Sequence, residues 1–171
     1  MTTTPTPELT AAITACLDGH WAGTRQRIRA ELDPQTVLLP AEGSLEDKRA
    51  ATTAALLQLA EQDLAGMGYA ESGGARNDVG GTVVAFETIA ALDLSLTVKM
   101  GVQFGLFGGA ISNLGNPEQH AAWLPPTGSG ELLGCFAMTE VGHGSDVQSL
   151  ETTATYDAAT GEFVIDSPTR S

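Results

Sequence analysis

The stretch ELLGCFAMTEVGHGSDVQSLETTATYDAATGEFVIDS, residues 131–167, is where the pattern of this chain changes. Its first ten residues alternate between two faces, one with Leu133, Cys135, Ala137 and Thr139, the other with Leu132, Phe136 and Met138. The segments LETTATYD and EFVIDS alternate as well, and AATG between them supplies Gly161 for a hairpin turn. The stretch therefore predicts the first strands of an antiparallel β domain.

The N-terminal part of the chain has a helical pattern instead. One helix is predicted from apolar residues at spacings of three and four, with arginines on its far side: Leu9, Ile13, Cys16, Leu17, His20 and Trp21, then Arg25, Arg27 and Arg29. Asp33-Pro34 should end it, because the residue before a proline is pushed out of the α region. Ser44 and Asp47 predict a capping box for a second helix that Gly66 and Gly68 close. A loop over residues 69–81 follows.

Residues 82–115 predict two apolar helices with a break near residues 93–97. The second contains Gly101, Gly105 and Gly109 in four-residue steps, and glycine costs roughly 1 kcal/mol per helical position relative to alanine. Such a bare face indicates that a neighbouring helix or a ligand lies close to it. Asn116-Pro117 then predicts the start of a short helix that ends near Leu124, with PPTGSG as a linker.

These patterns predict an α+β chain: an all-helical N-terminal domain, residues 1–130, followed by the beginning of an antiparallel β domain, residues 131–171. A sheet of so few strands is marginal in water without a partner. We therefore expect the chain to stop within its second domain.

Composition excludes several classes of function. The net charge of -13 disfavours nucleic acid as a partner, since only 8 residues are Lys or Arg. Cys16 and Cys135 form neither a disulfide framework nor a metal-site pattern, so we expect a reducing cytoplasm and no bound metal. No signal peptide and no membrane span are predicted, because the N-terminus MTTTPTPELT lacks an apolar core and long uninterrupted apolar runs are absent.

The turn FAMTEVGHGSD, residues 136–146, carries the candidate chemistry, and three interpretations of it compete. A serine hydrolase would use His143, Ser145 and Asp146, but the glycines precede the serine and no helix follows it. Alternatively, Gly142 and Gly144 allow backbone N–H groups to surround an anion, with hydroxyl donors nearby. The third interpretation is an ordinary hairpin connection, in which Glu140 is a solvent-facing strand residue.

The segment GCFAMTEVGHGSDVQSLETTATYD resembles the flavin-binding signature of the acyl-CoA oxidase and acyl-CoA dehydrogenase superfamily. Preceded by GVQFGLFGGAISNLG, it is most similar to the oxidase branch, and the resemblance runs from about Gly101 to the end of the chain. It implies a helical N-terminal domain, a central β domain and a C-terminal helical bundle. That order agrees with the change from helices to strands near residue 130.

The resemblance also implies roles for individual residues. Positions that contact FAD would be Phe136, Met138, Thr139, Gly144 and Ser145. Donors at Met138 and Thr139 would stabilise the negative charge of a reduced flavin, and Ser145 would also lie near the CoA part of the substrate. The glycines at 101–109 would lie where family members hold the acyl chain and flavin.

The activity that the resemblance implies is α,β-dehydrogenation of fatty acyl-CoA to trans-2-enoyl-CoA, a step of fatty acid β-oxidation. Its glutamate base belongs to the C-terminal bundle, so we assign no catalytic residue here and expect this chain alone to be inactive and to hold FAD weakly. The electron acceptor would be O2 or an electron-transfer flavoprotein, and the full-length protein would be a homo-oligomer. His143 hints at the oxidases, although a solvent-facing turn residue is the favoured interpretation of it. The alternative is a non-catalytic helical module that binds acyl-CoA or mediates oligomerisation.

Overall fold

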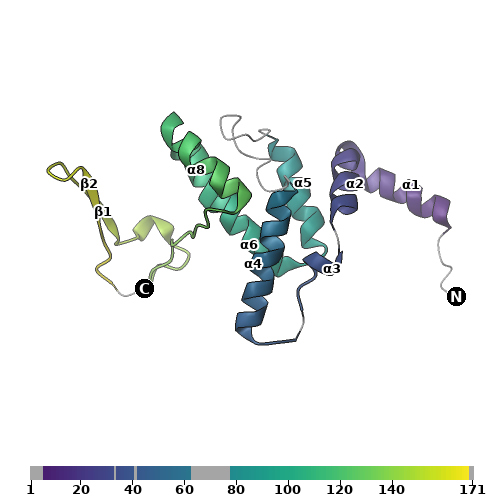
Figure 1. The fold of residues 1–171 in the computed structure, drawn as a ribbon, viewed down its shortest axis with the longest axis horizontal. Helices are drawn as coiled ribbons and strands as arrows, with labels where there is room; N and C mark the ends of the chain where they lie inside the picture. The colour runs from purple at the N-terminus through teal and green to yellow at the C-terminus, as the bar shows by residue number, and fades with distance from the viewer. Residues whose placement is uncertain (1–5, 33, 41, 63–77, 170–171) are drawn as a thin grey trace. The chain divides into compact units, whose positions relative to one another are not determined.

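The computed structural model describes residues 6–32, 34–40, 42–62 and 78–169. The chain divides into two compact units, Met1–Cys135 and Phe136–Ser171, which we describe separately. The first is helical and the second contains an antiparallel strand pair (Figure 1). The predicted α+β class is thus confirmed, and the domain division after residue 130 stays a proposal.

The N-terminal helix is shorter than predicted. Helix α1, Pro7–Asp18, is followed by a 3-10 helix, Gly19–Trp21, and then by α2, Ala22–Glu31. The prediction of one continuous helix was wrong. Gly19 has a φ of 54°, a backbone conformation that ends a helix and that glycine adopts readily. The apolar stripe expected to pack lies exposed on α1, where Leu9, Ile13 and Leu17 all face solvent.

The capping box at Ser44 is confirmed. Helix α3 spans Pro34–Val37, and α4, Leu45–Glu61, begins where the Ser44 hydroxyl accepts from the Asp47 N–H at 3.1 Å. Hydrogen bonds from the Ser44 side chain and backbone lower the pKa of the Asp47 carboxyl. The predicted closing glycines, Gly66 and Gly68, and most of the predicted loop lie outside the described residues.

The two apolar helices are confirmed, but the break between them lies at residues 91–93, earlier than the predicted 93–97. Helix α5, Val79–Ala90, starts earlier than predicted because Asp78 caps it through the Gly81 N–H at 2.7 Å. Helix α6, Leu94–Met100, starts at Asp93, whose Oδ1 accepts from the Leu96 N–H at 2.9 Å. In each helix the capping aspartate lies three residues before the amide that it binds.

The glycine-rich segment takes an unusual helical form, a π-helix over Gly101–Gly108 followed by α7, Gly109–Leu114. A Cβ on Gly105 or Gly109 would meet no atom within 4 Å, and one on Gly101 would meet only Phe86, at 3.6 Å. The expected close approach of a neighbouring helix is therefore wrong at Gly105 and Gly109 among the described residues. By length and composition alone, Leu94–Leu114 would suffice to cross a membrane, with a mean hydropathy of 1.3.

Helix α8, Pro117–Ser129, begins as predicted at the Asn116 cap but does not end near Leu124. It continues through Pro125 and Pro126 to Gly130, whose φ of 77° ends it, so the predicted linker is wrong. Burial explains the difference: Leu124 and Thr127 are both fully buried, which outweighs the two missing proline N–H donors. The Thr127 hydroxyl donates to the Trp123 carbonyl at 2.6 Å.

Gln103 joins the π-helix to the last residues of the helical unit. Its Nε2 donates to the carbonyls of Thr127 at 3.2 Å and Leu132 at 2.8 Å, and its Oε1 accepts from the Gly134 N–H at 2.9 Å. Gln103 is 2% exposed; its bond to Thr127 is buried and the other two are part-buried. The hydrophobic core is supplied mainly by α2, α4, α5, α6 and α8: Ile28, Leu56, Leu59, Ile89, Leu96, Met100 and Leu124.

The second unit contains the predicted hairpin. Strands β1, Thr153–Asp157, and β2, Glu162–Asp166, pair antiparallel with Thr153 opposite Asp166, and Gly161 has a φ of 73° in the turn. The strand predicted over residues 131–139 is absent: residues 133–139 take no regular secondary structure. A strand exists only through a ladder of hydrogen bonds, and in the described chain no neighbouring strand supplies one to this segment.

Candidate functional site

The candidate site is the turn of residues 136–146 in the second unit, and the Glu140 side chain organises it. Glu140 is 8% exposed, and its two carboxylate oxygens accept from the backbone N–H groups of Glu151 and Thr152, both at 2.8 Å. The Thr152 hydroxyl also donates to it. The prediction of a solvent-facing Glu140 is therefore wrong, because its carboxylate satisfies the backbone donors that precede β1.

These contacts also fix the charge of Glu140. The hydrogen bond from the Glu151 N–H, followed by that from the Thr152 hydroxyl, lowers the pKa of the Glu140 carboxyl, while burial opposes the shift. The Thr152 N–H and the nearby His143 act in the same direction as the first two. Glu140 is consequently an anion at neutral pH and ties the turn to β1.

The glycine turn itself is narrow. The His143 N–H donates to the Glu140 carbonyl at 3.0 Å, and Gly142 between them has a φ of 92° that favours glycine. The His143 Nε2 lies 3.5 Å from a carboxylate oxygen of Glu151, so this imidazole is half-buried and not simply solvent-facing. Beyond it, an added Cβ at Gly144 would meet nothing within 4 Å.

A cavity of about 330 Å³ adjoins this turn. It is lined by the turn, the residues before β1 and the end of the chain: Ala137, Met138, Thr139, Glu140, Leu150, Thr152, Ile165, Ser167 and Thr169. The Thr169 hydroxyl oxygen is buried and has no hydrogen-bond partner among the residues that the structure describes. An orphaned hydroxyl in a cavity wall is an available donor for a bound group.

The predicted cofactor residues fall into two groups. Met138 and Thr139 line the cavity, and both side chains are exposed, Met138 by 41%. Phe136, also 41% exposed, and the exposed Gly144 and Ser145 are not among the lining residues. The structure therefore brings two of the predicted residues to one cavity, and the roles of all five remain predictions.

The hydrolase interpretation gains no support from the geometry. The Asp146 carboxylate accepts from the Ser149 hydroxyl at 2.6 Å, and the His143 ring lies beside Glu151. Within the described part of the chain, no hydrogen bond joins Ser145 to His143 or His143 to Asp146. A serine nucleophile needs both.

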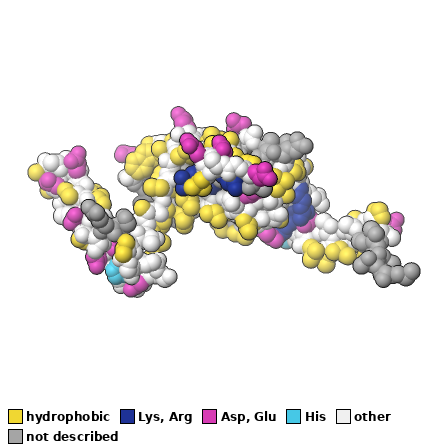
Figure 2. All heavy atoms as spheres, turned by 90° about the horizontal axis from the view of Figure 1, so that it is seen from below, with side chains coloured by type: hydrophobic (Ala, Val, Ile, Leu, Met, Phe, Trp, Pro, Cys, Tyr) yellow, Lys and Arg dark blue, Asp and Glu magenta, His cyan; other side chains and the backbone are white. Residues whose placement is uncertain are grey.

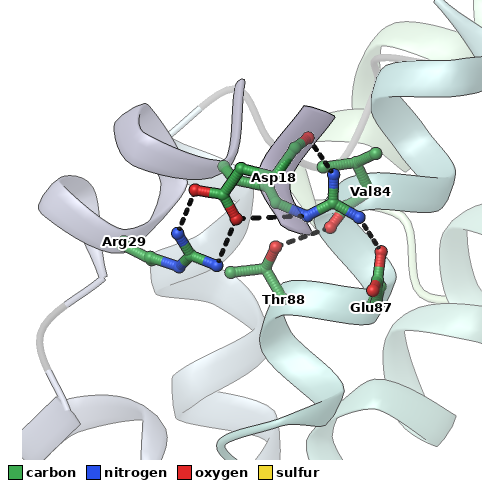
Figure 3. A network of polar contacts seen from close by, with 6 residues as sticks. Asp18, Arg29, Val84, Glu87 and Thr88 are labelled. Carbon is green, nitrogen blue, oxygen red and sulfur yellow. Dashed lines mark hydrogen bonds and ion pairs between the residues drawn. The ribbon is translucent and has the colours of Figure 1, made fainter. Parts of the chain in front are cut away.

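A second polar cluster lies in the helical unit, where Asp18 is 3% exposed and holds Arg29 in a two-bond contact of 2.7 and 2.9 Å (Figure 3). Arg25 donates to the Asp18 carbonyl at 3.0 Å and forms an ion pair with Glu87 on α5. The Arg29 hydrogen bond lowers the pKa of Asp18, against the effect of burial, and the charges of Arg29 and Arg25 add to the lowering.

The helical pattern predicts these arginines on the side of the helix opposite its apolar residues. It does not predict the cluster that they form with Asp18. A signal was present, because Asp18, Arg25 and Arg29 are separated by seven and eleven residues, about two and three helical turns. In the described residues, no group of three or more His, Cys, Asp or Glu side chains could hold a metal ion.

Comparison with known proteins places the chain in a family. Residues 24–131 match the family described as "Acyl-CoA dehydrogenase, N-terminal domain". An acyl-coenzyme A oxidase-like protein of Mus musculus is 50% identical over 82 residues, which cover 48% of this chain and 13% of that protein. Peroxisomal acyl-coenzyme A oxidase 2 of Arabidopsis thaliana is 48% identical over 82 residues, which cover 48% of this chain and 12% of that protein. The chain thus spans only a small part of these relatives.

A solved structure has the same fold. The acyl-CoA dehydrogenase of Bacillus anthracis, crystallised in complex with FAD, matches with a TM-score of 0.65 and 23% identity. The match covers 95% of this chain and 26% of that one. The match over residues 24–131 shows that this chain belongs to the acyl-CoA dehydrogenase family, and the structure of the Bacillus anthracis protein shows the shared fold.

Proposed function

We propose that the protein containing this chain catalyses FAD-dependent α,β-dehydrogenation of fatty acyl-CoA to trans-2-enoyl-CoA. The cavity beside Thr139 is the observation that carries this proposal. Its wall combines an apolar side chain, Met138, with the hydroxyls of Thr139 and Thr169, and the Thr169 hydroxyl is buried without a partner among the described residues. A flavin ring is flat and apolar with a polar edge, which these residues fit.

The roles of the chain's own residues follow from this cavity. FAD, when bound, accepts the hydride that leaves the substrate. The Thr139 hydroxyl would donate a hydrogen bond to the polar edge of the ring, and Met138 would contact the ring. The backbone N–H groups around Gly144 and the hydroxyl of Ser145 would face phosphate groups. Glu140 stays buried and charged, and both of its carboxylate oxygens accept hydrogen bonds from Glu151 and Thr152, so it would support the turn.

We further propose O2 as the electron acceptor, because the mouse and Arabidopsis relatives described above are named as an acyl-coenzyme A oxidase-like protein and an acyl-coenzyme A oxidase. An electron-transfer flavoprotein is the alternative acceptor. Both cysteines, Cys16 and Cys135, are free and exposed, which supports a reducing compartment such as the cytoplasm. The Arabidopsis relative is a peroxisomal protein by name. Homo-oligomerisation of the full-length protein remains part of the proposal.

The test is a peroxide assay in air on the full-length protein with fatty acyl-CoAs of several chain lengths. Peroxide formed in step with enoyl-CoA would support an oxidase. Enoyl-CoA formed only with an added electron-transfer flavoprotein would overturn the choice of O2 and retain the dehydrogenation. Acyl-CoA binding without either product would instead favour a non-catalytic module.

A further inference from the structure

A second hollow, of about 410 Å³, lies in the helical unit between α4 and α6. Its lining residues are Arg49, Thr52, Thr53, Ser95, Val98, Lys99 and Val102. Residues 49, 52 and 53 share one face of α4, and residues 95, 98, 99 and 102 share one face of α6 and the first turn of the π-helix. The two helices pack against each other, so these faces meet along one groove.

The side chains that line the hollow carry positive charge, which is unusual in this acidic protein. The chain has a net charge of -13 and only 8 Lys and Arg residues, yet two of these cations line the hollow, and none of its described lining residues is acidic. Figure 2 shows Lys and Arg side chains gathered in separate places over the helical unit. A pair of like charges on neighbouring helices repel each other unless an anion lies between them.

The two cations also lack partners that would neutralise them. Arg25, Arg27 and Arg29 each form an ion pair with an aspartate or glutamate. In the parts of the chain that the structure describes, neither Arg49 nor Lys99 forms one. Asp93 is the acid nearest in sequence to Ser95, and its oxygens already accept from the N–H groups of Leu96, at 2.9 Å, and Leu39, at 3.4 Å.

The hydrogen-bond donors that are available in the hollow indicate which class of ligand it would bind. The hydroxyls of Thr52 and Thr53 donate to the carbonyls of Lys48 and Arg49, at 2.7 and 3.0 Å, so they cannot also donate to a ligand. The donors that remain are the Arg49 guanidinium, the Lys99 ammonium and the Ser95 hydroxyl. Guanidinium and ammonium groups placed together are suited to phosphate oxygens, which accept charge-assisted hydrogen bonds.

We infer that the hollow between α4 and α6 binds the phosphate or diphosphate group of a small molecule, held by Arg49, Lys99 and Ser95. All lining residues of this hollow belong to the helical unit, whereas those of the cavity proposed for the flavin belong to the second unit. Val98 and Val102 give the hollow an apolar side that an organic group attached to the phosphate would contact.

The test is a titration of the 171-residue chain with sodium diphosphate at low ionic strength, followed by calorimetry and by NMR shifts of the α4 and α6 amides. We expect one saturable site, and a loss of affinity of about tenfold or more in the double variant Arg49→Gln/Lys99→Gln. Arg27→Gln removes the same charge from α2 and should leave the affinity unchanged. Circular dichroism checks that each variant is folded, and Lys99→Arg, which retains the charge, should retain binding.

A second titration with adenosine diphosphate separates two sources of the phosphate. Tighter binding than diphosphate would assign the site to a phosphorylated organic molecule that contacts the valines, and equal binding would assign it to the inorganic ion. The inference would be overturned if binding did not saturate, or if Arg27→Gln lost as much affinity as the double variant. Either result would mean that the anion is attracted to the positive charges in general and not to this hollow.

Discussion

At the scale of single residues, a few polar side chains shape the two cavities and the turn. The sequence predicts the position of only some of them. Glu140 is the clearest case: alternation predicts an exposed side chain, whereas the structure buries it against the Glu151 and Thr152 amides. Periodicity assumes that a segment has regular structure. Residues 133–139 have none, so the rule fails there for a physical reason.

Replacing Thr139 by valine should weaken flavin binding by roughly tenfold, because valine keeps the shape and removes the hydroxyl donor. This prediction rests on the proposed function and is measured by fluorescence titration of the full-length apoprotein with FAD. Thr155→Val, on the exposed strand β1, is the matched control and should bind as the parent does. Equal affinity in both variants would show that the Thr139 hydroxyl does not reach the flavin.

Glu140→Gln should loosen the turn, with roughly tenfold less protection of the Glu151 and Thr152 amides from hydrogen exchange. The parent protein should lose the same protection in acid. Because the folded-state pKa of Glu140 is lowered, its stabilising effect is complete above the unfolded-state pKa and is lost as pH falls through the folded-state value. The variant should show no such pH dependence at these two amides. Protection that is equal in both proteins at neutral pH would contradict the assigned role.

At the scale of elements, capping residues were predictable and helix ends were not. Ser44 and Asn116 were identified as caps from local residue types alone, and the structure confirms both. The continuation of α8 through Pro125 was not predictable, since it depends on the burial of Leu124 and Thr127 by distant elements. The break at Gly19 is visible only in its positive φ, because many helical glycines have none.

Two glycines near this break should respond in opposite directions to alanine. Gly19→Ala should lower the free energy of unfolding by about 1–3 kcal/mol, because alanine rarely adopts a φ of 54°. Gly23→Ala, within α2, should raise it by up to about 1 kcal/mol through helix propensity. Neither new Cβ would meet an atom within 4 Å, so the difference in unfolding free energy between the two variants does not include a steric clash. Urea unfolding of both variants is the measurement, and shifts of the same sign would contradict the account.

Gln103→Met should lower the free energy of unfolding by about 1–3 kcal/mol, since it removes three hydrogen bonds and leaves the Leu132 carbonyl and the Gly134 N–H, both part-buried, without this partner. Gln58→Met, on an exposed position of α4, is the control and should change little. A small effect at Gln103 would mean that water replaces the amide in these contacts.

At the scale of the whole molecule, the sequence predicted the order of helices and strands, the hairpin and the family. The buried acids were the part that it could not predict. Asp18 and Glu140 are buried against partners eleven and twelve residues further along the chain, Arg29 and Thr152, with which the alternation and helical patterns did not pair them. The chain covers about an eighth of its oxidase relatives, so the activity of the whole protein is inferred from family membership and one cavity.

The central claim, that this chain forms part of a flavin site that oxidises acyl-CoA, is tested most directly by anaerobic titration of the full-length protein with a fatty acyl-CoA. The account predicts that the purified protein is yellow and that the flavin absorbance near its visible maximum bleaches in proportion to added acyl-CoA. A protein that binds FAD but keeps its full flavin absorbance with every acyl-CoA would contradict the account.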